Sequence, residues 1–195
     1  MTNQVPAAVR SAVEADIPAI AEIHRESLAG DVFPSMGTHF LRKYYRHVLQ
    51  SDGGHLLVAT SEGKVAGFIA VAMETQSVLR LVGARDLLHL ALSCVRKPGL
   101  LLSAIVQLRK RGAAAQTDSA EISFFAVGNS GRGQGIGRML LARAMAIARD
   151  KGKAYARTKT SNRRLSRFYQ GSFGAAPVER FSVLGREFVV LKWKV

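Results

Sequence analysis

The 195-residue sequence has one cysteine, Cys94, and half as many acidic as basic residues. A single thiol excludes an internal disulfide and any zinc site built on several cysteines. The histidines show no H-E-x-x-H or similar spacing, so we expect no metal site. No charged segment followed by an apolar run opens the chain, and the apolar stretches between residues 87 and 108 are interrupted at 96–99. Since neither half reaches the ~20 residues of a membrane span, we expect a cytoplasmic protein.

The excess of basic residues limits the classes of partner that we expect the protein to bind. Lys and Arg number 28 against 14 Asp and Glu, a formal net charge of +14. Such a balance favours a polyanionic partner: a nucleotide-bearing cofactor, a nucleic acid or an anionic membrane surface. No aromatic platform or recognition-helix motif is evident, so nucleic acid is a poor candidate for the main partner. The length and the 48% hydrophobic content predict a single globular domain over residues 1–195.

Hydrophobic periodicity predicts a mixed α/β protein. The predicted strands cover residues 5–13, 55–60, 65–73, 121–127, 153–160, 178–184 and 187–195. The predicted helices cover residues 16–28, a segment around residues 40–48, and residues 136–151 and 162–170. Between the third and fourth strands lies a long segment, residues 77–116, whose leucine-rich part at 77–111 predicts two amphipathic helices around Lys97-Pro98-Gly99.

A glycine-rich turn at residues 128–137 joins the strand at 121–127 to the helix that follows. The phosphate-binding loop of nucleoside-triphosphate hydrolases needs Lys and then Ser or Thr at the positions of Gln134 and Gly135. That type of loop is therefore excluded. A dinucleotide fingerprint needs G-x-G-x-x-G and a later acidic residue on the next strand, and the sequence has neither. What remains is Arg132-x-x-Gly135-x-Gly137 at the start of a helix, where bare backbone N–H groups favour an anion.

This pattern resembles motif A, R/Q-x-x-G-x-G/A, of the GNAT superfamily of acyl-CoA-dependent N-acetyltransferases. Residues 121–127 resemble the strand that precedes the motif in that family, and Asn162 with Phe168-Tyr169 resembles its N-(x)n-[FL]-Y pattern. The resemblance covers roughly residues 5–75 and 117–195. It implies a mixed, mostly antiparallel central sheet flanked by helices, with residues 77–116 as a helical insertion between the third and fourth strands.

The resemblance also implies an activity and a set of site residues. The chain would transfer an acetyl group from acetyl-CoA to a primary amine of a small molecule, by direct attack of the amine on the thioester. Tyr169 would protonate the leaving thiolate, and Glu121 would act as the base that deprotonates the amine. Asn162 and the main chain of the fourth strand would hold the pantetheine arm, with the Val127 N–H polarising the thioester carbonyl. The residues implied in coenzyme binding are Phe125, Ala126, Val127, Arg132, Gly133, Gln134, Gly135, Ile136, Gly137, Arg138 and Asn162.

Several alternatives stay open at this point. Glu121 also fits a structural carboxylate paired with an arginine, and Tyr169 an aromatic residue that packs on the sheet. The chain as a whole also fits a non-catalytic acyl-CoA-binding or regulatory module of the same fold, or a basic nucleic-acid-binding protein. The insertion at 77–111 fits a lid, a homodimer surface, or a peripheral contact with the inner face of a membrane. Its leucine and arginine content is a weak indication of an amino sugar or glycan precursor as acceptor.

Overall fold

The computed structural model describes residues 7–29, 32–74, 81–96, 118–183 and 186–195. Its strands are β1 (Ala8–Ser11), β2 (Gly54–Ser61), β3 (Lys64–Ala72), β4 (Ser119–Val127), β5 (Tyr155–Thr160), β6 (Ala176–Val183) and β7 (Arg186–Lys194). Its α-helices are α1 (Ile17–Ser27), α2 (Val32–Ser35), α3 (Thr38–Gln50), α4 (Ala84–Arg96), α6 (Ile136–Asp150) and α7 (Arg163–Phe173). The 3₁₀ turns η1 (Glu14–Asp16) and η3 (Asn129–Gly131) precede α1 and α6.

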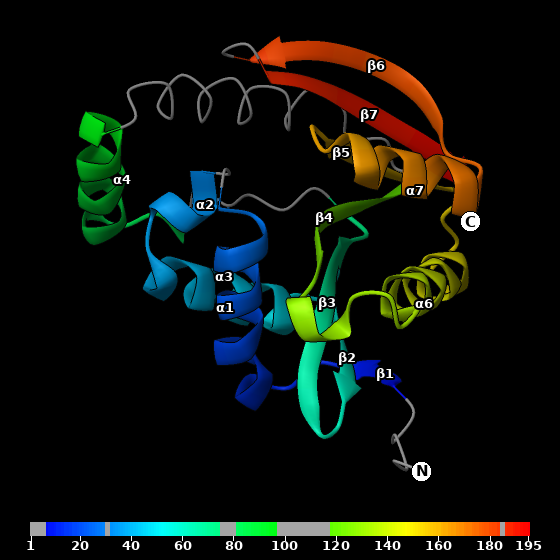
Figure 1. Ribbon diagram of the computed structural model, residues 1–195, viewed down its shortest axis with the longest axis horizontal. Coiled ribbons are helices and arrows are strands. Elements are labelled where there is room, and N and C mark those ends of the chain that lie inside the picture. The colour runs from blue at the N-terminus through cyan, green and yellow to red at the C-terminus, as the bar shows by residue number, and fades with distance from the viewer. Residues whose placement is uncertain (1–6, 30–31, 75–80, 97–117, 184–185) are drawn as a thin grey trace.

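The strands form one seven-stranded sheet in the order β1-β2-β3-β4-β5-β7-β6. Only β4 and β5 are parallel, and every other pair is antiparallel. Figure 1 shows α1 and α3 on one side of this sheet and α6 and α7 on the other. The predicted fold class, a mostly antiparallel central sheet flanked by helices, is therefore confirmed.

Two hydrophobic clusters fill the spaces between the sheet and its helices. Leu140 and Leu141 of α6 and Tyr169 of α7 belong to one, and Phe40 and Tyr45 of α3 belong to the other. These side chains are almost fully buried, and each contributes roughly 1.5–3 kcal/mol on transfer from water. Because both faces of the central strands are covered, β3 reads as a nearly continuous apolar run instead of an alternating one.

The strand β4 contains a bulge. Its pairing with β3 moves from Ala70↔Phe124 to Val71↔Ile122, so Ser123 is an extra residue without an opposite partner. Before the bulge, Ile122 faces the α6 and α7 side. After it, Phe125 faces that side and Phe124 faces α1 and α3. The bulge thus changes which β4 side chains face the α1 and α3 side of the sheet and which face the α6 and α7 side.

The strands β4 and β5 separate just before the bulge. Their parallel pairing ends at Glu121↔Arg157, and from there the Thr158 hydroxyl donates a hydrogen bond to the Ile122 carbonyl at 3.1 Å. Beyond this point the edge of β4 that faces β5 has no strand partner among the described residues. The sheet is therefore open at its centre, next to the end of β4.

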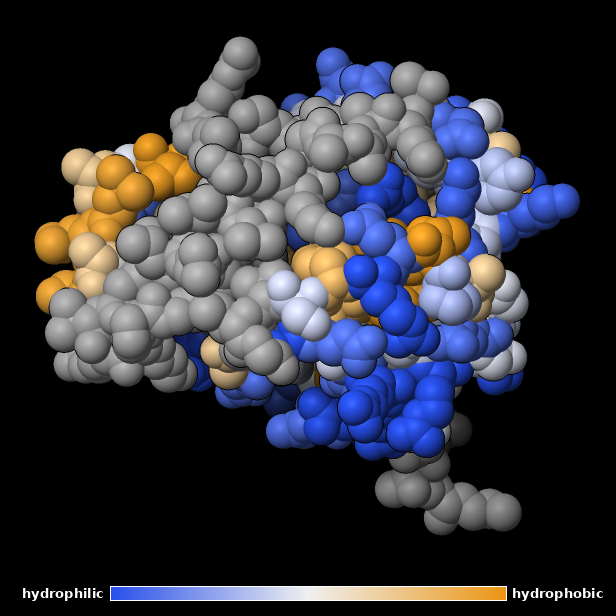
Figure 2. All heavy atoms as spheres, turned by 90° about the horizontal axis from the view of Figure 1, so that it is seen from above, coloured by the Kyte–Doolittle hydropathy of each residue, from blue (hydrophilic) through white to orange (hydrophobic). Residues whose placement is uncertain are grey.

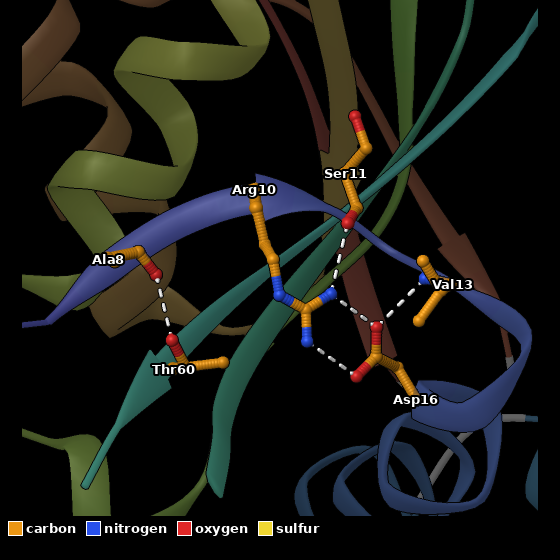
Figure 3. A network of polar contacts seen from close by, with 6 residues as sticks. All are labelled: Ala8, Arg10, Ser11, Val13, Asp16 and Thr60. Atoms are coloured by element: carbon orange, nitrogen blue, oxygen red, sulfur yellow. Dashed lines mark hydrogen bonds and ion pairs between the residues drawn. The ribbon is translucent and has the colours of Figure 1, made fainter. Parts of the chain in front are cut away.

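A bidentate ion pair fixes the entry of the chain into α1 (Figure 3). The Arg10 guanidinium donates to both Asp16 carboxylate oxygens, at 2.6 and 2.9 Å, and the Val13 N–H donates to the same carboxylate at 2.8 Å. The hydrogen bonds from Arg10 lower the pKa of Asp16 below its ordinary value. This network ties β1 to the start of α1.

Within the insertion predicted at 77–116, the structure describes one helix, α4, and residues 81–83 before it. The Asp86 side chain is buried, forms an ion pair with His39 Nε2 at 2.5 Å and accepts from the Gly83 N–H at 2.8 Å. This contact holds α4 against α3. The second predicted helix lies outside the described residues.

Candidate active site

The glycine-rich loop connects β4 to α6. Gly133 and Gly135 have φ angles of 81° and 75°, which side chains rarely allow, and Gly135 is the N-cap of α6. Gly131, which the sequence analysis did not single out, is required for another reason. A Cβ there would lie 2.9 Å from the Ile136 side chain and 3.0 Å from the Ala66 carbonyl oxygen. The loop conformation is therefore set by glycine.

The loop presents a row of backbone N–H groups. Those of Arg138 and Met139 donate to the Gly135 carbonyl at 3.0 and 3.1 Å, whereas those of residues 133–137 have no acceptor within the described part of the chain. They lie at the N-terminus of a helix, where the helix dipole adds positive potential. Arg132 and Arg138 are exposed beside them. This geometry fits a diphosphate group.

Gln134 contributes to the loop in a different way from its neighbours. Its side-chain amide donates to the Ser130 carbonyl at 2.9 Å, and the Ser61 hydroxyl donates to its Oε1 at 3.4 Å. The side chain thus braces the loop against the turn between β2 and β3. The backbone N–H of Gln134 remains available to a ligand.

The hydrogen-bond pattern of β4 directs main-chain groups into the open edge. The Gly128 N–H donates to the Ala66 carbonyl at 2.9 Å, which makes that position a hydrogen-bonded pair. Since such pairs alternate in an antiparallel ladder, the main chains of Val127 and Phe125 point away from β3. Ala126 points its main chain toward β3, opposite Phe68. Phe125 and Val127 therefore offer N–H and C=O groups to a ligand between β4 and β5.

A cavity of about 180 Å³ occupies this separation between β4 and β5. Three predicted site residues line it: Phe125, Asn162 and Tyr169. Six further lining residues, which the sequence analysis did not identify, come from the C-terminal end of α1 and from β5 and β7: Ser27, Leu28, Thr158, Lys159, Arg186 and Phe188. No local motif marks these residues, because only the fold brings the end of α1 and the start of β7 to β5.

Tyr169 lies at the wall of the cavity and is almost completely buried, with 1% of its surface exposed. Its ring stacks on Trp193 at 5.3 Å between centroids and contacts Phe125 at 6.2 Å. Burial raises the pKa of its hydroxyl, and a hydrogen bond with the Thr158 side chain acts in the opposite direction. The phenol therefore keeps its proton at neutral pH, as a general acid must.

Asn162 is the N-cap of α7. Its Oδ1 accepts hydrogen bonds from the N–H groups of Arg164 and Leu165 at 2.9 and 3.1 Å. The carboxamide NH₂ has no acceptor among the residues described, so it remains available as a donor to a ligand. The Asn162 oxygen thus stabilises the start of α7, and its NH₂ group is available to a ligand in the cavity.

Glu121 is the last residue of β4 that pairs with β5, and its side chain is half-buried. By the alternation of β4 it lies on the sheet face that α1 and α3 cover, one residue before Ile122 in the cavity lining. It makes no ion pair with any residue of the described ranges, although Arg157 is its partner across the ladder. Glu121 is therefore adjacent in sequence to a residue of the cavity lining, but its own side chain does not line the cavity.

Among the described residues, no group of three or more His, Cys, Asp or Glu side chains is arranged to hold a metal ion. Within the same residues, no helix is long and apolar enough to cross a bilayer.

Comparison with known proteins agrees with this geometry. The sequence model of the acetyltransferase (GNAT) family matches residues 17–175. Similar solved structures include a ribosomal-protein-alanine N-acetyltransferase from Brucella melitensis, with 18% identity, a TM-score of 0.62, and coverage of 96% of this chain and 99% of that one. Ard1 from Thermoplasma volcanium has 17% identity, a TM-score of 0.61 and coverage of 98% and 99%.

An N-acetyltransferase from Staphylococcus aureus Mu50 shows 16% identity, a TM-score of 0.62, and coverage of 97% of this chain and 99% of its own. At these identities the likeness concerns the fold. No curated protein sequence matches the chain significantly.

Proposed function

Because the chain belongs to the acetyltransferase (GNAT) family, whose members take their acetyl group from acetyl-CoA, we propose that it acetylates a primary amine of a small molecule. An amino sugar or a glycan precursor is one such acceptor, for which the leucine and arginine content of residues 77–111 is a weak indication. One observation carries the proposal. The N–H groups of residues 133–137, which have no acceptor among the described residues, lie in the loop that follows the strand whose open edge borders the cavity. A diphosphate bound to that loop would direct the attached pantetheine arm toward the cavity.

The backbone of the loop would bind the diphosphate, with Arg132 and Arg138 adding positive charge on either side. The Asn162 NH₂ and the main chains of Phe125 and Val127 would hold the pantetheine arm as an additional strand. The Val127 N–H would then polarise the thioester carbonyl as negative charge develops on its oxygen. Acetyl-CoA supplies the activated acetyl group, and the protein supplies its orientation.

In the proposed reaction, the amine nitrogen forms a bond to the thioester carbonyl carbon and the carbon–sulfur bond breaks. Tyr169 gives its proton to the departing thiolate, and the amine loses one proton, so that amide and thiol are both neutral products. Burial raises the pKa of Tyr169, so the phenol carries its proton at neutral pH and can donate it when the thiolate forms. Thr158 holds the phenol in place.

Glu121 is our candidate for the base that receives the proton of the amine. It lies at the point where β4 and β5 separate and has no ion-pair partner among the described residues. Because it does not line the cavity, a water molecule between the carboxylate and the amine would carry the proton. Return of the proton to Tyr169 completes the cycle.

The test of the function has two measurements. Calorimetry is expected to detect binding of acetyl-CoA, and an assay for free thiol is expected to detect coenzyme A release when a panel of primary amines is added. Binding without thiol release from any amine would support the non-catalytic module instead. Absence of coenzyme binding, together with salt-dependent retention on DNA, would support the nucleic-acid-binding alternative.

The exposed apolar face of α4 is a candidate surface for contact with a second protein copy or with a membrane. Leu87, Leu88 and Leu92 are 54%, 61% and 56% exposed, and Figure 2 shows a corresponding apolar patch at the edge of the molecule. We propose that this face forms the homodimer contact or the peripheral membrane contact predicted for residues 77–111. Sedimentation with anionic vesicles at low salt identifies the membrane contact, and a concentration-dependent size in solution identifies the dimer.

A further inference from the structure

The Tyr169 hydroxyl has one polar partner among the described residues, the side chain of Thr158. Thr158 lies on β5, is almost fully buried and lines the cavity together with Tyr169. Its hydroxyl also donates to the Ile122 carbonyl oxygen on β4 at 3.1 Å. These hydrogen bonds connect α7 to β4 through β5, at the point where the two strands separate.

The direction of each hydrogen bond follows from the hydrogens available. A carbonyl oxygen accepts only, and a threonine hydroxyl has a single hydrogen to donate. Since Thr158 gives this hydrogen to Ile122, its contact with Tyr169 is satisfied only when the phenol is the donor. Thr158 therefore fixes the phenol oxygen beside the open edge of β4, with the phenol hydrogen directed at the threonine.

The ring of Tyr169 is held by a second residue. Trp193, the only tryptophan in the chain, stacks on it with 29° between the ring planes. The indole N–H donates to the Met145 sulfur at 3.2 Å, which fixes the indole in turn. Trp193 lies opposite Ala156 on β5, and Thr158 is two residues further on the same face of that strand. The ring and the oxygen of Tyr169 are thus held separately, and the hydroxyl hydrogen is the part of the side chain that can still change direction.

Loss of the Tyr169 proton to a thiolate would change the hydrogen bonds of Thr158. A phenolate oxygen accepts only, so Thr158 keeps a favourable contact with it by rotating its own hydrogen from Ile122 to the phenolate. A hydrogen bond donated to the charged form of an acid favours that form. Thr158 acts on the pKa of Tyr169 in this direction, against the effect of burial. The one hydroxyl can thus serve both protonation states of the phenol.

We propose that Thr158 is a positioning residue that acts through Tyr169, with a hydroxyl that alternates between two acceptors. Before proton transfer it donates to the Ile122 carbonyl and fixes the phenol oxygen; after the transfer it donates to the phenolate. In the transfer, the O–H bond of Tyr169 breaks and an S–H bond forms on the departing thiolate, while Thr158 keeps its hydrogen throughout. This inference rests on the proposed acetyltransferase function and adds a residue to its acid.

The experiment is a double-mutant cycle measured by thiol release. Thr158→Val removes the hydroxyl and keeps the branched shape, and Thr158→Ser keeps the hydroxyl. Each is combined with Tyr169→Phe, which removes the phenol oxygen. Thr160→Val is the matched control, because Thr160 is 8% exposed against 6% for Thr158, lies two residues further along β5, and accepts its hydrogen bond from the Asn162 N–H instead. The fluorescence emission of Trp193 shows in each variant whether the ring stack is preserved.

We expect Thr158→Val to lower kcat about tenfold with KM for acetyl-CoA nearly unchanged, and Thr158→Ser to restore most of the loss. In the Tyr169→Phe background, Thr158→Val should change kcat by less than about twofold, because the hydroxyl through which it acts is gone. Thr160→Val should have the same effect, large or small, in both backgrounds. Thr158→Ala repeats the cycle with a side chain that fits without a clash.

An equal loss of kcat from Thr158→Val in both backgrounds would assign Thr158 to structure and overturn the proposal. A Thr158→Ser variant as impaired as Thr158→Val would also overturn it, since the hydroxyl would then not be the active group. Wild-type kcat in Thr158→Val would reject the positioning role and leave the transferase function intact. Absence of thiol release from the wild-type protein with every amine rejects that function itself.

Discussion

The glycine loop and the cavity next to it are built by different means. The loop presents backbone N–H groups, and its shape depends on the absence of side chains at Gly131, Gly133 and Gly135. The cavity depends on side chains from α1, β4, β5, α7 and β7. From this difference we expect coenzyme binding to depend on a short motif, and acceptor choice to depend on residues from several parts of the fold. Variants in each region should therefore affect different kinetic constants.

The largest effect is expected in the cavity. Tyr169→Phe removes only the hydroxyl and keeps the ring that stacks on Trp193, so folding should be preserved. We expect kcat to fall about 100-fold, the usual scale of a general acid, with KM for acetyl-CoA nearly unchanged. Steady-state kinetics measures both constants. Unchanged turnover would remove Tyr169 from the mechanism.

The second effect belongs to the loop. Gly135→Ala places a Cβ at φ 75°, which costs roughly 1–2 kcal/mol and displaces the N–H groups that follow. We expect KM for acetyl-CoA to rise about tenfold with little change in kcat. Gly152→Ala is the matched control, because Gly152 has a φ of 72° at the other end of α6. That variant should lose similar stability but keep the KM of the wild type. Equal KM values in the two variants would contradict the role of the loop.

A smaller effect is expected at the border between the two regions. Glu121→Gln removes a base but keeps the size of the side chain, so kcat should fall several-fold near neutral pH. The rise of activity with pH that an ionising base produces should also disappear. The measurement is the pH–rate profile with a saturating donor. A profile identical to that of the wild type would assign Glu121 to structure.

The smallest effect lies outside both regions and concerns stability alone. Asp16→Asn loses the ion pair with Arg10 and should lower the free energy of unfolding by about 1 kcal/mol. The Asp16 pKa is lowered in the folded protein from its ordinary 3.8. Its contribution is therefore complete above that value and is lost as the pH falls through the lower folded value. Urea unfolding at neutral pH and below pH 4 measures the difference, and the kinetic constants should not change.

Local patterns were sufficient for much of the fold. The sequence Ser61-Glu62-Gly63-Lys64 is typical of a hairpin turn between β2 and β3, and Glu62 and Gly63 have φ angles of 53° and 74°. Other boundaries differ because tertiary contacts extend or shorten an element. The helix predicted at 162–170 continues to Phe173, whose side chain packs against the hydrophobic cluster that contains Leu140 and Tyr169, and Gly174 with a φ of 65° caps its end.

The sequence by itself determined the glycine-rich loop, because a glycine pattern between a strand and a helix specifies a backbone conformation that needs few distant contacts. It also indicated Tyr169 and Asn162, through a resemblance in motif. Only the tertiary structure decided that β4 and β5 separate after Glu121, and that Arg186 of β7 meets Ser161 at the end of β5. Such contacts join residues far apart in the chain, and their charges act together only after folding brings them within a few ångströms of one another.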